Sequence, residues 1–95
     1  MPTTILQSAE LARNRFVKGE IAAGIAFARN AMEEQQTSPA MAATFEADAR
    51  DCYETAIKLL SQAESMPLEL NAMLDELKER LDFLQSMMMV LSAAA

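Results

Sequence analysis

Histidine and tryptophan are absent from this chain of 95 residues, and cysteine occurs only once. Without histidine, the chain lacks the residue that most often serves as general base, as activator of a nucleophile and as zinc ligand. Carboxylate-bridged di-iron bundles also depend on Glu-x-x-His motifs. These absences argue against an enzyme, and we expect no catalytic residue, no cofactor and no metal site.

The single cysteine, Cys52, cannot form a disulfide within the chain. A reducing compartment fits this composition, so we expect a cytoplasmic protein. The first 15 residues have neither a basic start nor a continuous apolar stretch, so they do not resemble a signal peptide. Because no segment approaches the roughly 18 apolar residues of a membrane-spanning helix, we expect no membrane association.

Basic residues are scarce as well, with 8 Lys and Arg against 14 Asp and Glu, for a net charge of −6. This balance argues against binding to nucleic acid or to an anionic membrane surface. Residues 1–29 are mildly basic, and the remainder is strongly acidic. Such an asymmetry suits the steering of a partner, or more simply a set of solvated helix faces.

Few residues favour a β-strand: alanine, leucine and methionine dominate, there are only two glycines, and β-branched residues are few. Proline follows Ser38 and Met66, and proline is tolerated in the first turn of a helix but not later. Each site therefore marks a place where one helix ends and another begins. The sequence predicts one all-α domain, residues 1–95, folded as an antiparallel bundle of three long helices at about residues 4–36, 39–65 and 67–91.

Two of these segments carry apolar residues at alternating spacings of four and three, which is typical of a helix with one buried face. The stripe of the second segment is Phe45, Ala49, Cys52, Ala56, Leu59 and Ala63. The stripe of the third segment is Leu70, Leu74, Leu77, Leu81, Leu84, Met88 and Leu91. In this arrangement Cys52 is a small buried hydrophobic residue rather than a nucleophile.

The first segment carries two apolar sets on different sides of a helix. One set is Ile5, Ala9, Ala12, Phe16, Ala23 and Phe27. The other is Leu6, Val17, Ile21, Ile25, Ala28 and Met32. Gly19 lies where the sets meet and Gly24 a turn later, and each glycine costs a helix interior about 1 kcal/mol relative to alanine. The segment is either one long helix with a weak middle or a hairpin broken at Gly19, which would give four helices.

The hairpin alternative brings a family resemblance with it. Residues 10–32, "ELARNRFVKGEIAAGIAFARNAM", resemble a tetratricopeptide repeat unit through Ala12, Phe16, Gly19, Gly24, Ile25 and Ala31. Residues 56–67, "AIKLLSQAESMP", resemble the second helix of another unit, at a spacing close to that family's period. The second unit lacks a glycine where its turn would fall. The resemblance implies the binding of a peptide or protein in a groove, and no catalytic residues.

The chain ends in "LDFLQSMMMVLSAAA", with no charge after Asp82. Methionine is flexible and polarizable, and it can repack against different surfaces. Leu84, Met88 and Leu91 continue the core stripe, but a three-helix bundle buries only one stripe per helix. We therefore expect the other apolar residues of this end to lie in an interface. The predicted partner-binding residues are Phe83, Met87, Met88, Met89, Val90 and Leu91.

The function that follows is a non-enzymatic protein–protein interaction module, an adaptor or a small chaperone-like protein, which binds a partner through this apolar C-terminal helix. The alternative is a structural homodimer or oligomer in which the helix completes a bundle with a second copy. In both cases the partner is a protein, and no small-molecule substrate is evident from the sequence.

Overall fold

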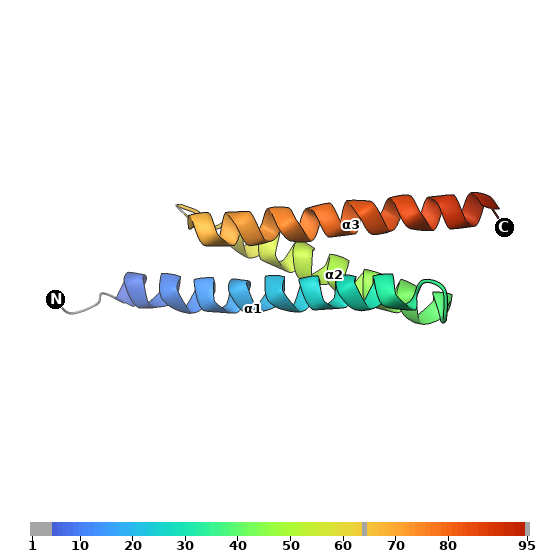
Figure 1. Ribbon diagram of the computed structural model, residues 1–95. Coiled ribbons are helices and arrows are strands. Elements are labelled where there is room, and N and C mark those ends of the chain that lie inside the picture. Colours follow the sequence, from blue (N-terminus) through green and yellow to red (C-terminus); the bar gives the residue numbers. More distant parts are fainter. Residues whose placement is uncertain (1–4, 64, 95) are drawn as a thin grey trace.

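Three α-helices, joined by two short connections, make up the computed structural model, which describes residues 5–63 and 65–94 and all of their side chains except those of residues 6 and 91–94. They are α1 (Ile5–Glu34), α2 (Pro39–Leu60) and α3 (Leu68–Ala94). Consecutive helices reverse direction, so α1 and α3 run the same way (Figure 1). The molecule is a rod with extents of 61 × 17 × 17 Å. The predicted all-α bundle of three long helices is confirmed.

The first helix, α1, continues through Gly19 without interruption, so the alternative of four helices with a break at that residue is wrong. Gly19 is exposed, but Val17 and Ile21 on either side of it are buried, and their packing keeps the helix continuous through the glycine. The burial of this continuous face offsets the roughly 1 kcal/mol that glycine costs in a helix. The buried positions of this face keep the alternating spacing of four and three and continue one residue past the end of α1: Val17, Ile21, Gly24, Ala28, Ala31 and Gln35.

A proline and a serine define the start of α2. Pro39 occupies the first helical turn, and the side chain of Ser38 accepts a hydrogen bond from the Met41 backbone N–H at 3.4 Å. The helix ends at Leu60, five residues before the predicted end. Beyond Leu60 the chain turns through tighter hydrogen bonds, including the one from the N–H of Ala63 to the carbonyl of Leu60.

The first helix, α1, packs against both of the other helices, whereas α2 and α3 contact each other less. Gly24, about two thirds of the way along α1, lies close to both of the other helices. A Cβ atom at this position would lie 2.7 Å from Cδ2 of Leu77 in α3 and 3.0 Å from Cβ of Cys52 in α2. The missing side chain of Gly24 is therefore what lets the three helices meet.

The helices are staggered rather than flush. Because α1 and α3 are parallel and Gly24 lies beside Leu77, the first residue of α3 lies level with about Arg15, and Gln35 lies level with about Met88. The N-terminal turns of α1 and the last turns of α3 therefore extend past their neighbours at opposite ends of the rod (Figure 1). These two projecting segments have the least cover from the rest of the chain.

Candidate functional site

One helix, α3, positions all the residues of the predicted binding site. Its core stripe lies where the sequence predicts it, with Leu70, Leu74, Leu77, Leu81 and Leu84 all buried. One residue corresponds to a rotation of about 100° around a helix. Phe83, directly before the buried Leu84, is therefore turned away from the core and is 52% exposed. In its C-terminal half, α3 thus has a second apolar side that its own bundle leaves uncovered.

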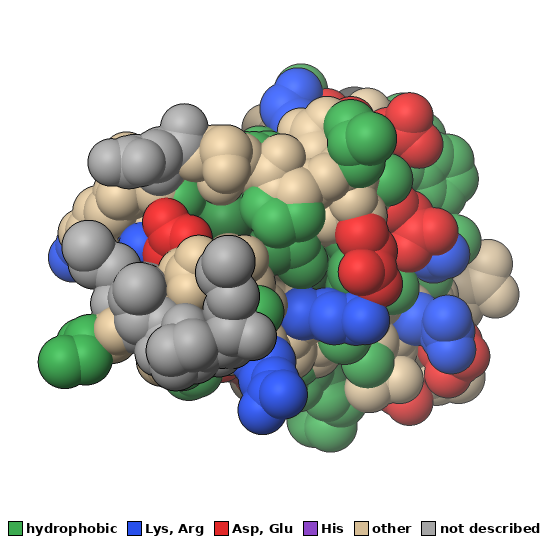
Figure 2. Space-filling model, turned by 90° about the vertical axis from the view of Figure 1, so that its left-hand side faces the viewer, with side chains coloured by type: hydrophobic (Ala, Val, Ile, Leu, Met, Phe, Trp, Pro, Cys, Tyr) green, Lys and Arg blue, Asp and Glu red, His purple; other side chains and the backbone are tan. Residues whose placement is uncertain are grey.

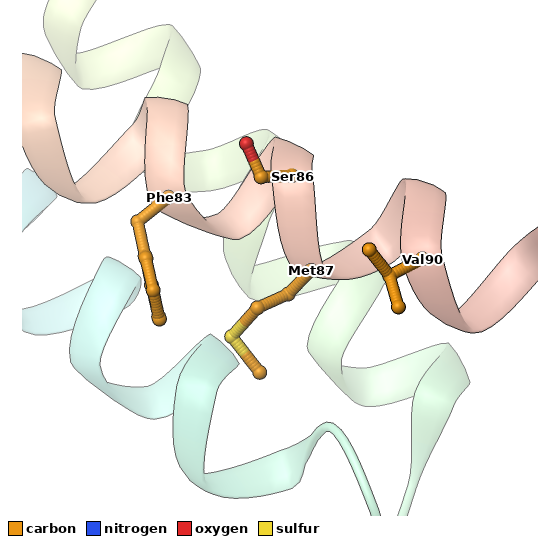
Figure 3. Close-up of a pocket in the computed structure, with 4 residues that line it drawn as sticks. All are labelled: Phe83, Ser86, Met87 and Val90. Atoms are coloured by element: carbon orange, nitrogen blue, oxygen red, sulfur yellow. The ribbon is translucent and has the colours of Figure 1, made fainter.

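We call this second side the α3 flank, and it consists of Phe83, Met87 and Val90. Together with Ser86 these residues line a shallow hollow of about 330 Å³ whose walls are almost entirely apolar. Phe83 and Met87 point in the same direction, toward the side of α3 on which α1 lies in Figure 3. Val90 is 68% exposed and lies one turn beyond them.

The α3 flank offers a partner almost no polar group. Ser86 has a hydroxyl, but its Oγ donates a hydrogen bond to the backbone carbonyl of Asp82 at 3.1 Å. That bond uses the hydroxyl proton within the helix. No charged residue follows Asp82 in the sequence. Contact with this surface would therefore depend on the burial of apolar side chains, at roughly 25 cal/mol per Å².

The remaining predicted site residues do not share this surface. Met88 is half-buried in line with Leu84, as a continuation of the core stripe. Met89 is 66% exposed but lies two positions after Met87, which places it about 160° around the helix from the flank. Leu91 belongs to α3, and its side chain lies outside the described residues. The structure thus brings together three of the six predicted residues, Phe83, Met87 and Val90.

A second uncovered apolar surface lies at the opposite end of the rod, on the first turns of α1. Ile5 and Phe16 are exposed, as are Ala9 and Ala12 at the intervening turns. Their alternating spacing was visible in the sequence, where it indicated a face inside the bundle. The structure leaves Ile5, Ala9 and Ala12 open because α2 and α3 do not extend beside the first turns of α1. Phe16, level with the start of α3, is exposed because it directly precedes the buried Val17 and is turned about 100° away from it.

Basic residues accompany this second surface. Figure 2 looks along the rod from the end where α1 begins, and it shows Lys and Arg side chains interspersed with Asp, Glu and apolar side chains. Arg13, Arg15 and Lys18 all belong to this part of α1. Lys18 binds Glu69 of α3 at 2.7 Å, and both side chains are more than half exposed. This end of the molecule therefore combines apolar groups with charged groups, of which Lys18 is paired with a carboxylate of α3.

The thiol of Cys52 lies inside the bundle rather than in a site. Burial raises its pKa, and the nearby carboxylates, Glu20 first among them, raise it further. A thiol in such surroundings stays protonated and is a poor nucleophile at neutral pH. Among the described residues, no group of three or more His, Cys, Asp or Glu side chains lies close enough to hold a metal ion.

No helix within the described part of the chain is long and apolar enough to cross a membrane. The sequence matches no protein-family model, and no curated protein or solved structure matches it either. The resemblance of residues 10–32 and 56–67 to tetratricopeptide repeat units stays a prediction. Residues 10–32 all belong to α1, which has no turn at Gly19.

Proposed function

We propose that this protein is a non-enzymatic interaction module that binds the apolar face of a partner helix through the α3 flank. A single observation carries the proposal: Phe83, Met87 and Val90 form a continuous apolar surface on the side of α3 next to α1, where Met87 is half-buried and Phe83 and Val90 are more than half exposed. Helix recognition of this kind reads apolar residues at spacings of three and four. We place the protein in the cytoplasm as an adaptor or a chaperone-like protein.

The chemistry of the flank supports a protein partner. Its hollow is open and shallow, so it suits a row of side chains better than an enclosed small molecule. Met87 has an unbranched, flexible side chain, which can adjust to partners of different shape. Five acidic residues precede the flank on α3, against two basic ones. A partner helix with basic residues beside its apolar face would therefore be preferred.

The second candidate function is a structural homodimer in which the flank packs against another copy of the chain. One observation favours it, namely the uncovered apolar and basic surface on the first turns of α1. A protein with two unsatisfied surfaces can satisfy both by self-association. In that case the flank is a permanent contact rather than a site for exchangeable partners.

The test uses a fluorescein-labelled amphipathic helical peptide of leucine and lysine, titrated with protein and followed by anisotropy. The double change Met87→Asp with Val90→Asp places two charges on the flank, and we expect it to weaken peptide binding at least tenfold. The matched control is Met41→Asp with Ile57→Asp, which alters two exposed apolar residues of α2. This control should bind as the wild type does.

Equal loss in the flank variant and in the control would mean that the peptide binds to any apolar surface, and the proposal would be wrong. The same conclusion follows if the wild type does not bind the peptide at any protein concentration. Circular dichroism of each variant shows whether the helices are retained. Because all four residues are at least partly exposed, we expect the three-helix fold to persist in both double variants.

A further inference from the structure

We infer that the occupant of the α3 flank is an amphipathic helix of another protein, which runs antiparallel to α3 and carries basic residues after its apolar ones. The inference rests on the proposed function, because it names the chemistry of the partner that binds this same surface. It follows from two carboxylates, those of Glu79 and Glu76, which lie on the same side of α3 as the flank, one and two turns before it.

The two carboxylates and the flank form one continuous face of α3. Glu79 precedes Phe83 by four residues and Glu76 precedes it by seven, and these intervals correspond to about one and two helical turns. At about 100° per residue, both carboxylates and all three residues of the flank fall within an arc of about 80°. A helix laid along the flank therefore also passes over Glu79 and Glu76.

The carboxylate of Glu79 is available to a partner. Its side chain is exposed, and none of the ion pairs within the described part of the chain involves it. Glu76 is paired only loosely, since its Oε2 atom lies 3.9 Å from Nε of Arg80, and its side chain is 53% exposed. Residues 75–82 contain four acidic and two basic residues, so this segment keeps a net negative charge. A cation on the partner would therefore be attracted to this end of the face.

A second copy of the chain does not supply that cation through the same surface. If two flanks packed in an antiparallel pair, Phe83 of one copy would lie beside Val90 of the other, and Glu79 would lie beside the last turn of α3. No charged residue follows Asp82, so the carboxylate would meet no basic side chain there. In a parallel pair, the two Glu79 residues would lie side by side and repel each other. Charge thus favours a different protein over a second copy as the occupant.

The helix dipoles favour an antiparallel partner. The last turns of α3 carry the partial negative charge of a helix C-terminus, which attracts the N-terminal turns of a neighbouring helix. A partner in this orientation contacts Val90 first and Glu76 last. Counted from its N-terminus, its apolar residues fall at positions i, i+3 and i+7 and its basic residues at i+11 and i+14, because these intervals mirror those of the face on α3.

The test compares two fluorescein-labelled peptides of identical composition by anisotropy at low ionic strength. Both carry leucine at i, i+3 and i+7 among alanine and glutamine. The first peptide has lysines at i+11 and i+14, and the second has them at i−4 and i−7, on the other side of the leucines. We expect the first to bind the wild type about threefold more tightly, which is the effect of one or two exposed ion pairs. Salt at about 1 M should remove this difference by screening.

Substitution of the carboxylates identifies the groups responsible. In the double variant Glu76→Gln with Glu79→Gln, both peptides should bind with the same affinity. The matched control is Asp51→Asn with Glu54→Gln, which removes two charges from exposed residues of α2 and should keep the threefold difference. Because both double variants alter exposed polar side chains, the fold should persist in each.

Three results would overturn the inference: equal affinity of the wild type for the two peptides, tighter binding of the second peptide, or a difference that survives in the Glu76→Gln, Glu79→Gln variant. In each case the proposed function stands if Met87→Asp with Val90→Asp still weakens the binding. A wild-type dimer that the peptides dissociate, seen by light scattering, would also overturn it, because a second copy would then occupy the flank. If neither peptide binds, the inference and the proposed function both fail.

Discussion

At the scale of the residue, the two glycines of α1 have opposite roles. Gly24 is the point at which three helices meet, and an added Cβ would come within 3.0 Å of Cys52 and still closer to Leu77. Leu77 is fully buried and has little room to move aside. An added Cβ at Gly19 would meet nothing within 4 Å. Gly24 is thus required by packing, whereas Gly19 only weakens the helix.

This contrast predicts opposite effects of the same substitution. Gly19→Ala should raise the free energy of unfolding by about 0.5–1 kcal/mol, because alanine favours the helix. Gly24→Ala should lower it by about 1 kcal/mol, since the cost of overpacking exceeds the same gain in helix propensity. Urea denaturation followed by circular dichroism measures both. Equal stabilisation in the two variants would contradict the close approach at Gly24.

The buried thiol of Cys52 gives a second prediction at this scale. Its pKa is raised by burial and by Glu20, so the folded state disfavours the thiolate more than the unfolded state does. The resulting contribution to stability is complete below the ordinary thiol pKa of about 9 and is lost as the pH rises through the folded-state value. We expect a thiol reagent at pH 8 to react slowly until urea unfolds the chain. Rapid reaction with the native protein would show that Cys52 is accessible.

At the scale of the element, α3 carries two apolar sides with different roles. Leu84 is fully buried, whereas its neighbour Phe83 is half exposed. Leu84→Ala should lower the free energy of unfolding of the monomer by about 3 kcal/mol. Phe83→Ala should cost less than about 1 kcal/mol when measured at a concentration where the protein is monomeric. If both substitutions cost the same, Phe83 belongs to the core and the α3 flank is not a free surface.

The three helices also differ in how far the sequence predicts them. The leucine stripe of α3 is regular, and its buried residues were all predicted. The core face of α1 was not settled by the sequence, because Phe16 and Val17 lie in two competing stripes of similar strength. Which stripe is buried depends on which sides of α1 the helices α2 and α3 cover, and this is a property of the bundle rather than of α1. Similarly, the sequence predicts an apolar C-terminal segment, but it does not show which of its methionines share a surface. The rotation of α3 relative to the bundle places Met87 on the flank and Met89 about 160° around the helix from it.

At the scale of the whole molecule, the rotation of α3 and the stagger of the helices together determine which apolar side chains remain exposed. A flush three-helix bundle would cover the first turns of α1 and the last turns of α3 to the same extent as the middle. Here both segments project at opposite ends of a 61 Å rod, one apolar and basic, the other apolar and preceded by acidic residues. The molecule therefore exposes two surfaces that suit protein contacts.

The most direct test of the α3 flank as a protein-binding surface follows the methionine methyl groups by NMR. The protein is labelled with ¹³C at these methyls, and spectra are recorded at two concentrations a hundredfold apart and with a saturating amphipathic peptide. We expect the signal of Met87 to shift with concentration or with peptide, and that of Met41, exposed on α2, to stay in place. A Met87 signal that never moves, or one that moves no more than Met41, would contradict the account.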